Sequence, residues 1–455
     1  MQLRANQQSV YALLGGLLAL LSLSLWGGVV ALDGQLILGF TVTLVTIFGF
    51  SLITWWLMFS PIQNVKAVTP RRLASSTRQT LALLVAGSAA LLTLGLTWDE
   101  VWHRAYGVPL GEDFFWRPHI LMYVSFGLIA AFAFGGLTVI NRNPGIFRQK
   151  FRAEPLLGLL VLLSGFTLVS LPVDPLWHRI YGVDLTAWSM PHLVMFGAAG
   201  LIFVIGAAMQ SSVIPRTGWR LGFGLRELVA AFMLAQSMLI LITLLVVEWD
   251  GPRVALGQMQ SAFYDRPQWL FPALIVGLMT LFGLLSLKLF QRVGAATLCG
   301  VLMLVSRWFM IEMFGASDIG MTIRPQIIAL IPLIVLDVVY FVRRQEADSV
   351  MTARIAACLA SVIGLAVTVF IISQWYGFPL VTPSFVLQVA VFGLPLTLLM
   401  AWYGYEIGQG LSRLRGDDGV TVTESRLILL RGAAGVAVML LLTAWFVMTA
   451  TSPVA

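Results

Sequence analysis

The chain consists mainly of long apolar stretches separated by short polar segments. A helix needs about 20 apolar residues to cross the hydrocarbon core of a bilayer, and by that measure the pattern predicts about thirteen spanning helices. They are expected at residues 10–32, 36–59, 80–98, 118–140, 156–172, 191–212, 227–247, 269–288, 294–314, 326–342, 355–373, 385–404 and 429–450. The residues do not alternate between apolar and polar as in barrel strands. We therefore predict an all-α, polytopic membrane protein with antiparallel neighbours.

The composition strengthens this prediction and narrows the expected partners. Hydrophobic residues make up 59% of the chain and charged residues 11%, against about 25% charged residues in a soluble domain. The net charge of +7 is spread over short loops, so we expect the lipid bilayer, and no nucleic acid, as a partner. Cys299 and Cys358 both lie inside apolar runs, so no disulfide framework is implied.

The basic residues predict an orientation. Most Lys and Arg residues fall in one set of alternate loops, such as 142–152 and 343–354, and few fall in the other set. The positive-inside rule then places the N-terminus in the cytoplasm. We expect a multi-pass protein of the cytoplasmic (inner) membrane, with the loops after residues 98 and 172 on the extracytoplasmic side.

All four histidines of the chain fall in two copies of one motif. The first copy reads TWDEVWHRAYGVPLGEDFFWRPH and contains Asp99, His103 and His119. The second reads PVDPLWHRIYGVDLTAWSMPH and contains Asp174, His178 and His192. Each copy offers one carboxylate and two imidazoles, a set of ligands that suits copper, zinc or iron.

The spacing within each copy predicts how these side chains meet. Asp and His four residues apart share one face of a helix, and the second His follows a proline, which suits the first turn of the next helix. Asp113 and Asp184 could be further ligands or could fix a His tautomer. Trp102 and Trp177 are expected beside the metal, and further tryptophans would enclose each site, namely Trp98, Trp116 and Trp188.

Weaker copies of the motif predict a repeated architecture. Later loops keep the proline but carry Ala273, Gln326 or Ser384 where the second histidine would stand. We interpret spans three to twelve as five helix–loop–helix pairs, two of which kept metal ligands. The expected organisation is a two-helix unit with its loop at 1–79, the duplicated motif region at 80–212, degenerate repeats at 213–404, and a loop with the last helix at 405–455.

Other readings of the same residues stay open. A buried Asp–His pair can be satisfied hydrogen bonding alone, and tryptophans gather at membrane interfaces without any metal. Haem is disfavoured, because each histidine pair brackets a loop beside an aspartate. Arg307, Glu312 and Asp337 inside predicted spans mark either an ion path or an internal ion pair that fixes helix packing.

At the two motifs the chain resembles the C subunit of the copper membrane monooxygenases, the particulate methane and ammonia monooxygenase family. That family carries an Asp-x3-His element with a downstream His, and a related Asn-x3-His element with its own. The matching residues here are Asp99, His103 and His119, followed by Asp174, His178 and His192. Asp174 stands where the family has Asn, and this chain is about twice as long. The resemblance implies copper, companion membrane subunits and oxygen-dependent hydroxylation of a small apolar substrate.

The leading hypothesis is thus an integral membrane protein that binds copper, with iron and zinc as alternatives, at extracytoplasmic Asp-His-His sites. An oxygen-dependent oxidoreductase, or a subunit of one, is the natural extension. A metal or ion transporter, a metal-delivery protein and a scaffold subunit of a membrane complex are the alternatives.

Overall fold

The computed structural model is helical throughout most of its described residues and confirms the predicted all-α, polytopic membrane architecture. The structure describes residues 45, 48–49, 52–58, 60–62, 72–106, 115–181, 190–214, 218–246, 253–255, 258–260, 267–375, 382–414 and 422–449. For some residues inside helices, His178 among them, it describes only the backbone. The span predicted at 10–32 lies outside the described residues, and the one at 36–59 is described only in part.

Within those described ranges, ten helical segments are long and apolar enough to cross a membrane. In chain order they are α3 (Ser75–Tyr106), α4 (Arg117–Asn141), α6 (Pro155–Ser170) followed by α7 (Val173–Tyr181), α8 (Met190–Ser211), α9 (Leu225–Val246), α11 (Leu270–Phe290), α12 (Ala295–Met313), α13 (Arg324–Val342), α14 (Val350–Trp375), and the run of α15 (Pro383–Gln388), η5 (Val389–Gly393) and α16 (Leu394–Leu414). Each matches one predicted span. The span predicted at 429–450 falls in α17 (Val422–Met448), whose described apolar part, Ala437–Met448, is shorter than a span. The number thirteen stays a prediction.

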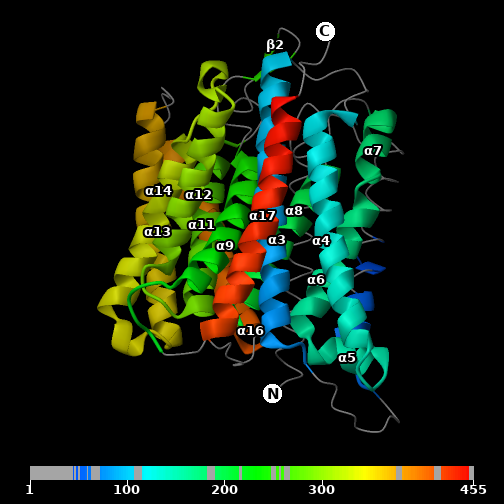
Figure 1. Ribbon diagram of the computed structural model, residues 1–455. Coiled ribbons are helices and arrows are strands. Elements are labelled where there is room, and N and C mark those ends of the chain that lie inside the picture. Colours follow the sequence, from blue (N-terminus) through cyan, green and yellow to red (C-terminus); the bar gives the residue numbers. More distant parts are fainter. Residues whose placement is uncertain are drawn as a thin grey trace.

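The long helices lie side by side with roughly parallel axes (Figure 1). Each of the five predicted helix pairs consists of helices that pack against each other: α3 with α4, α6 with α8, α9 with α11, α12 with α13, and α14 with α16. Neighbouring pairs also touch, through α4 and α6, α8 and α9, α11 and α12, and α13 and α14. The described part of α17 packs on α3, and its red ribbon crosses α3 in Figure 1.

Helix α11 forms the centre of the bundle. It is buried along nearly its whole length and contacts α9, α12, α13, α14 and α16. Its contact with α16 is close because α16 presents Gly404 and Gly408 to the backbone of α11 near Leu281 and Leu285. Small residues permit such approach between membrane helices, where packing replaces the hydrophobic effect as the driving force.

Several short elements join the long helices and were not predicted. They are α5 (Phe147–Ala153), the single turns η3 (Ala316–Ile319) and η4 (Arg344–Glu346), and an antiparallel hairpin of β1 (Arg253–Ala255) and β2 (Gln258–Gln260). The break between α6 and α7 was also missed. It coincides with Pro172, which has no N–H to continue the hydrogen-bond ladder of α6.

Candidate metal centre

The first motif begins on the last turns of α3. The predicted span ended at residue 98, but the helix continues through Asp99 and His103 to Tyr106. Gly107 and Pro109 follow in the sequence, and residues of these types commonly end helices. Because the helix is continuous, Asp99 and His103 lie on one face, one turn apart, as their spacing predicted.

The second histidine of the motif is carried by the first turn of α4. Arg117 and Pro118 open this helix, and His119 is its third residue. The proline suits a first helical turn, where its missing N–H would have no intrahelical acceptor. Gly95, one turn before Asp99 on α3, lies against the start of α4: a Cβ placed there would be 3.4 Å from the carbonyl oxygen of Pro118. The close approach of the two backbones brings His119 to Asp99.

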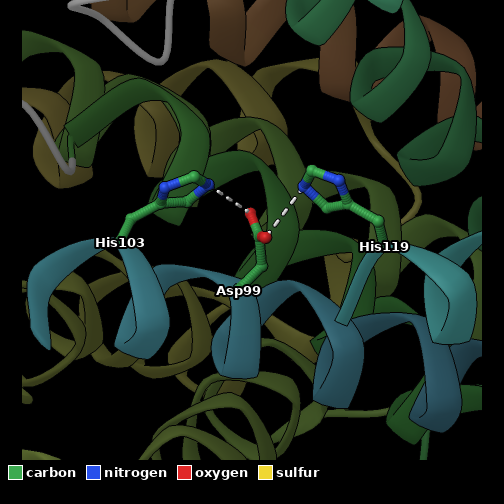
Figure 2. Close-up of side chains that lie close together, drawn as sticks. All are labelled: Asp99, His103 and His119. Carbon is green, nitrogen blue, oxygen red and sulfur yellow. Dashed lines mark ion pairs between the residues drawn. The ribbon is translucent and has the colours of Figure 1, made fainter. Parts of the chain in front are cut away.

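The three side chains converge on one point (Figure 2). The Asp99 carboxylate lies between the two imidazoles, with Oδ2 at 3.4 Å from Nε2 of His103 and Oδ1 at 2.9 Å from Nε2 of His119. One potential ligand atom from each residue lies within 4.8 Å of the others. The side chains are 14%, 27% and 11% exposed for Asp99, His103 and His119, so His103 is the most accessible. The structure thus forms a compact N, N, O cluster from two helices.

Aromatic rings lie beside this cluster. The Trp116 ring lies 5.4 Å from the His103 ring and 6.4 Å from the His119 ring, and it makes an edge contact with Trp102 at 5.5 Å. Trp102 in turn contacts the buried Trp98 at 5.4 Å. Trp116 therefore lies beside both imidazoles, and Trp102 and Trp98 extend from it in a chain of ring contacts, while enclosure of a metal stays a prediction. Such rings limit water and lower the local dielectric, which strengthens any electrostatic interaction at the three ligands.

A buried ion pair lies directly beside the cluster. Glu100, the residue after Asp99, accepts from Nη1 of Arg307 at 2.8 Å and from Nη2 at 3.2 Å, a two-point contact between α3 and α12. Arg104, one turn further along α3, donates to the same carboxylate at 2.9 Å. Arg307 is almost fully buried. Arg104 therefore pairs with Glu100 within its own helix.

The second motif is brought together only in part. Asp174 is the second residue of α7, and its Oδ1 lies 3.3 Å from Nε2 of His192. His192 is the third residue of α8, the same register that His119 has in α4. His178 lies on α7 one turn after Asp174, but its side chain is outside what the structure describes. Trp177 is partly buried on the same helix.

The remaining predicted residues have different outcomes. Asp113, Asp184 and Trp188 lie outside the described residues. In the degenerate repeats, the position of the second histidine again falls near a helix start: Gln326 is the third residue of α13, Ala273 the fourth of α11 and Ser384 the second of α15. All three residues thus lie near a helix start, as the proposed repeat predicts, and none of them offers an imidazole.

Two of the three charges predicted inside spans, Arg307 and Asp337, take part in helix packing. Arg307 pairs with Glu100 of α3. Both oxygens of Asp337 accept backbone N–H groups at the start of α12, from Gly294 and Thr297, each at 2.7 Å. Asp337 thus caps a neighbouring helix, because the first N–H groups of a helix have no intrahelical acceptor.

Comparisons with protein-family models, with curated proteins and with solved structures each find no match to this chain. The resemblance to the copper membrane monooxygenases stays a prediction.

Sequence reasoning missed three residues that shape the site. Glu100 was passed over because it fell just beyond the predicted end of its span. Gly95 looked like one of many membrane glycines, and Arg117, which donates to the carbonyl of Phe446 in α17 at 2.9 Å, looked like a loop residue. A signal for the first was available, since a lone buried arginine inside a span, Arg307, requires an acidic partner.

Proposed function

We propose that this protein binds a divalent transition metal through Asp99, His103 and His119, with copper as the first candidate and iron or zinc as alternatives. The observation that carries the proposal is the convergence of these three side chains from α3 and α4, with one potential ligand atom of each within 4.8 Å of the others. Imidazole suits copper, zinc and iron, and a carboxylate supplies the negative charge that offsets a divalent ion.

The donor distances fit such an ion. Metal–nitrogen and metal–oxygen bonds of about 2.0–2.2 Å at tetrahedral angles place neighbouring ligand atoms about 3.3 Å apart. The two contacts of the Asp99 carboxylate with Nε2 atoms, at 2.9 and 3.4 Å, are of this size. Only small side-chain movements would admit an ion. Three protein ligands leave a coordination position for water or a substrate, as in catalytic rather than structural sites.

The second motif is proposed as a second site of the same kind. Its ligands would be Asp174, His178 and His192, of which Asp174 and His192 already contact each other. The distribution of Lys and Arg supports an extracytoplasmic position for both sites. Occupation of both sites would give two metal ions per chain, and occupation of one site would give one.

The proposed role is that of an oxygen-dependent oxidoreductase or the metal-bearing subunit of one. A bound copper or iron ion would supply oxygen binding and one-electron chemistry. In this role Asp99 balances the ion's charge, the two imidazoles hold it, and the rings of Trp98, Trp102 and Trp116 keep bulk water from it. The aromatic surroundings favour a small apolar substrate, and companion membrane subunits would complete the enzyme.

Metal analysis of the natively purified protein tests the binding proposal. We expect about one or two metal ions per chain in the wild type and a near-complete loss in the His103→Ala/His178→Ala double variant. Gln326→Leu is a matched control, because Gln326 has the same helix register as the histidines but lies in a degenerate repeat. Equal and negligible metal in the wild type and the double variant would refute the proposal.

Two assays separate the enzymatic proposal from transport. Oxygen consumption with small hydrocarbons and ammonia, measured in native membranes that retain companion subunits, should depend on His103. Uptake of copper or zinc by proteoliposomes should be absent. Ion uptake without oxygen consumption would instead establish a transporter. X-ray absorption at the metal edge identifies the ion and its nitrogen and oxygen ligands.

A further inference from the structure

We infer that Glu100 and Arg307 are positioning residues for the metal centre: their two-point contact fixes the rotation of α3 so that Asp99 faces His119. This inference rests on the proposed metal site. Neither residue touches the proposed ion, and neither was a predicted ligand.

The geometry of the pair suits this role. Arg307 projects from α12, is 1% exposed on its side chain, and donates through both Nη atoms to the two oxygens of Glu100. Arg104 donates to Oε1 of the same carboxylate, so two arginines hold Glu100, one from α12 and one from its own helix. A planar guanidinium held at two points restrains orientation as well as distance, which a lysine ammonium does not.

The position of Glu100 in the sequence makes this restraint relevant to the metal. Successive residues of an α-helix point about 100° apart, so Glu100 can face α12 while Asp99 faces α4. Side chains extend about 5 Å from the helix axis, and a rotation of about 20° would move the Asp99 carboxylate by about 2 Å. Metal–ligand distances tolerate only about 0.2 Å. Fixing the rotation of this turn is therefore a condition for binding.

A second polar contact joins the same helices about two turns away. Thr93 of α3 donates to the side-chain oxygen of Gln236 in α9 at 2.7 Å, and Gln236 donates to Ser306 of α12 at 3.0 Å. Ser306 directly precedes Arg307. Thr93 and Gln236 are buried, so α3 is restrained against α9 and α12 over the stretch that leads to Asp99.

The opposite end of α3 provides a matched control. Arg78 pairs with Glu154 at 3.3 Å, and both side chains are about as buried as the Glu100 pair. Burial raises the pKa of Glu154, and the charge of Arg78 opposes this. The pair lies 21 residues before Asp99 on α3, which corresponds to about 30 Å along the helix. Glu154→Gln therefore removes a buried charge pair from α3 without reaching the metal site.

The experiment compares Glu100→Gln, Arg307→Lys and Glu154→Gln with the wild type, in detergent and near 20 °C. Affinity for Cu²⁺ and Zn²⁺ is measured by chelator competition. Nitroxide labels at Ala105→Cys and Val124→Cys, both exposed in the structure, report the α3–α4 distance without metal. The labelled background carries Cys299→Ala and Cys358→Ser.

We expect both Glu100→Gln and Arg307→Lys to weaken metal binding about 10- to 100-fold, and to broaden the label distances, while Glu154→Gln changes neither. Arg307→Lys keeps the positive charge, so weaker metal binding in this variant separates positioning from simple electrostatics. It also tests the inference if Glu100→Gln does not fold.

Three results would overturn the inference: wild-type affinity in both site variants, weakened affinity with unchanged label distances, or equal effects of Glu154→Gln. If the wild type binds no metal, the proposed function fails, and the label distances alone then decide whether the pair positions α3.

Discussion

Gly95 of α3 lies directly against Met122 of α4, so closely that a Cβ on the glycine would be 2.9 Å from Cγ of Met122 and 3.3 Å from its backbone nitrogen. Asp99 follows Gly95 by one turn, and His119 precedes Met122 by nearly one turn. The absence of a side chain at Gly95 therefore sets the separation of the two helices at the height where their ligands meet.

Gly95→Ala should separate helix packing from metal binding. The added methyl group displaces the first turn of α4, and we expect metal affinity to fall by about tenfold or more, as for other residues that support ligands. Overpacking costs about 1–3 kcal/mol, and the higher helix propensity of alanine offsets about 1 kcal/mol of this, so the net loss of stability should be small. Gly127→Ala on α4 is the control, because nothing lies within 4 Å of a Cβ there. Equal affinities for the two variants, measured by chelator competition, would contradict this account of the interface.

Metal removal should lower the thermal stability of the wild type. A ligand that binds only the folded protein stabilises it by about 2.7 kcal/mol at a free concentration 100 times its dissociation constant. Treatment with a chelator should therefore lower Tm in the wild type and have a smaller effect in Asp99→Asn, which keeps the shape of the side chain, loses its charge and leaves only the second proposed site. Differential scanning fluorimetry with and without added Zn²⁺ gives this comparison.

Gln326→Leu is the control for this comparison, because the chelator should lower its Tm as much as that of the wild type. An identical chelator effect in Asp99→Asn and the wild type would mean that the ion binds at another place.

The sequence was most informative where the same residues recurred. Two copies of Asp-x3-His with a Pro–His downstream predicted that ligands from consecutive helices would meet, and Asp99, His103 and His119 do meet. This was predictable because helix periodicity places residues four apart on one face, and a proline favours the start of a helix. The helical spans were predictable as well, since backbone N–H and C=O groups in lipid must be paired within the segment, as a complete helix pairs them.

Details that depend on neighbouring helices were not predictable. The contact between Glu100 and Arg307 joins residues 207 positions apart, and nothing in the spacing along the chain selects that pairing. Arg307 was instead considered together with Glu312 and Asp337, which share its apolar surroundings in sequence. The division between α6 and α7 coincides with Pro172, a local feature that a window of mean hydropathy does not detect.

Asp337 distinguishes helix packing from an ion path. Its carboxylate accepts two N–H groups of the α12 start, and the hollow of about 270 Å³ that it borders is otherwise lined by apolar residues and Thr297. Asp337→Asn should lower stability by about 1–2 kcal/mol through loss of one acceptor. Metal content should remain at the wild-type value. Abolished ion uptake in proteoliposomes, with unchanged Tm, would favour the transporter alternative instead.

The centre of the bundle should be sensitive to a single methyl group at Gly404. A side chain at this position of α16 would meet the backbone of Leu281 in α11, which cannot move without displacing the most buried helix of the bundle. We expect Gly404→Ala to destabilise the protein by about 1–3 kcal/mol, the usual effect of overpacking, because the helices must separate along their whole contact. Gly410→Ala lies on the same helix with open space around its Cβ and should be neutral. The stability of both variants is measured as Tm in detergent and as the monodisperse fraction of protein after extraction. A Gly404→Ala protein as stable as Gly410→Ala would show that α11 and α16 do not pack by backbone contact.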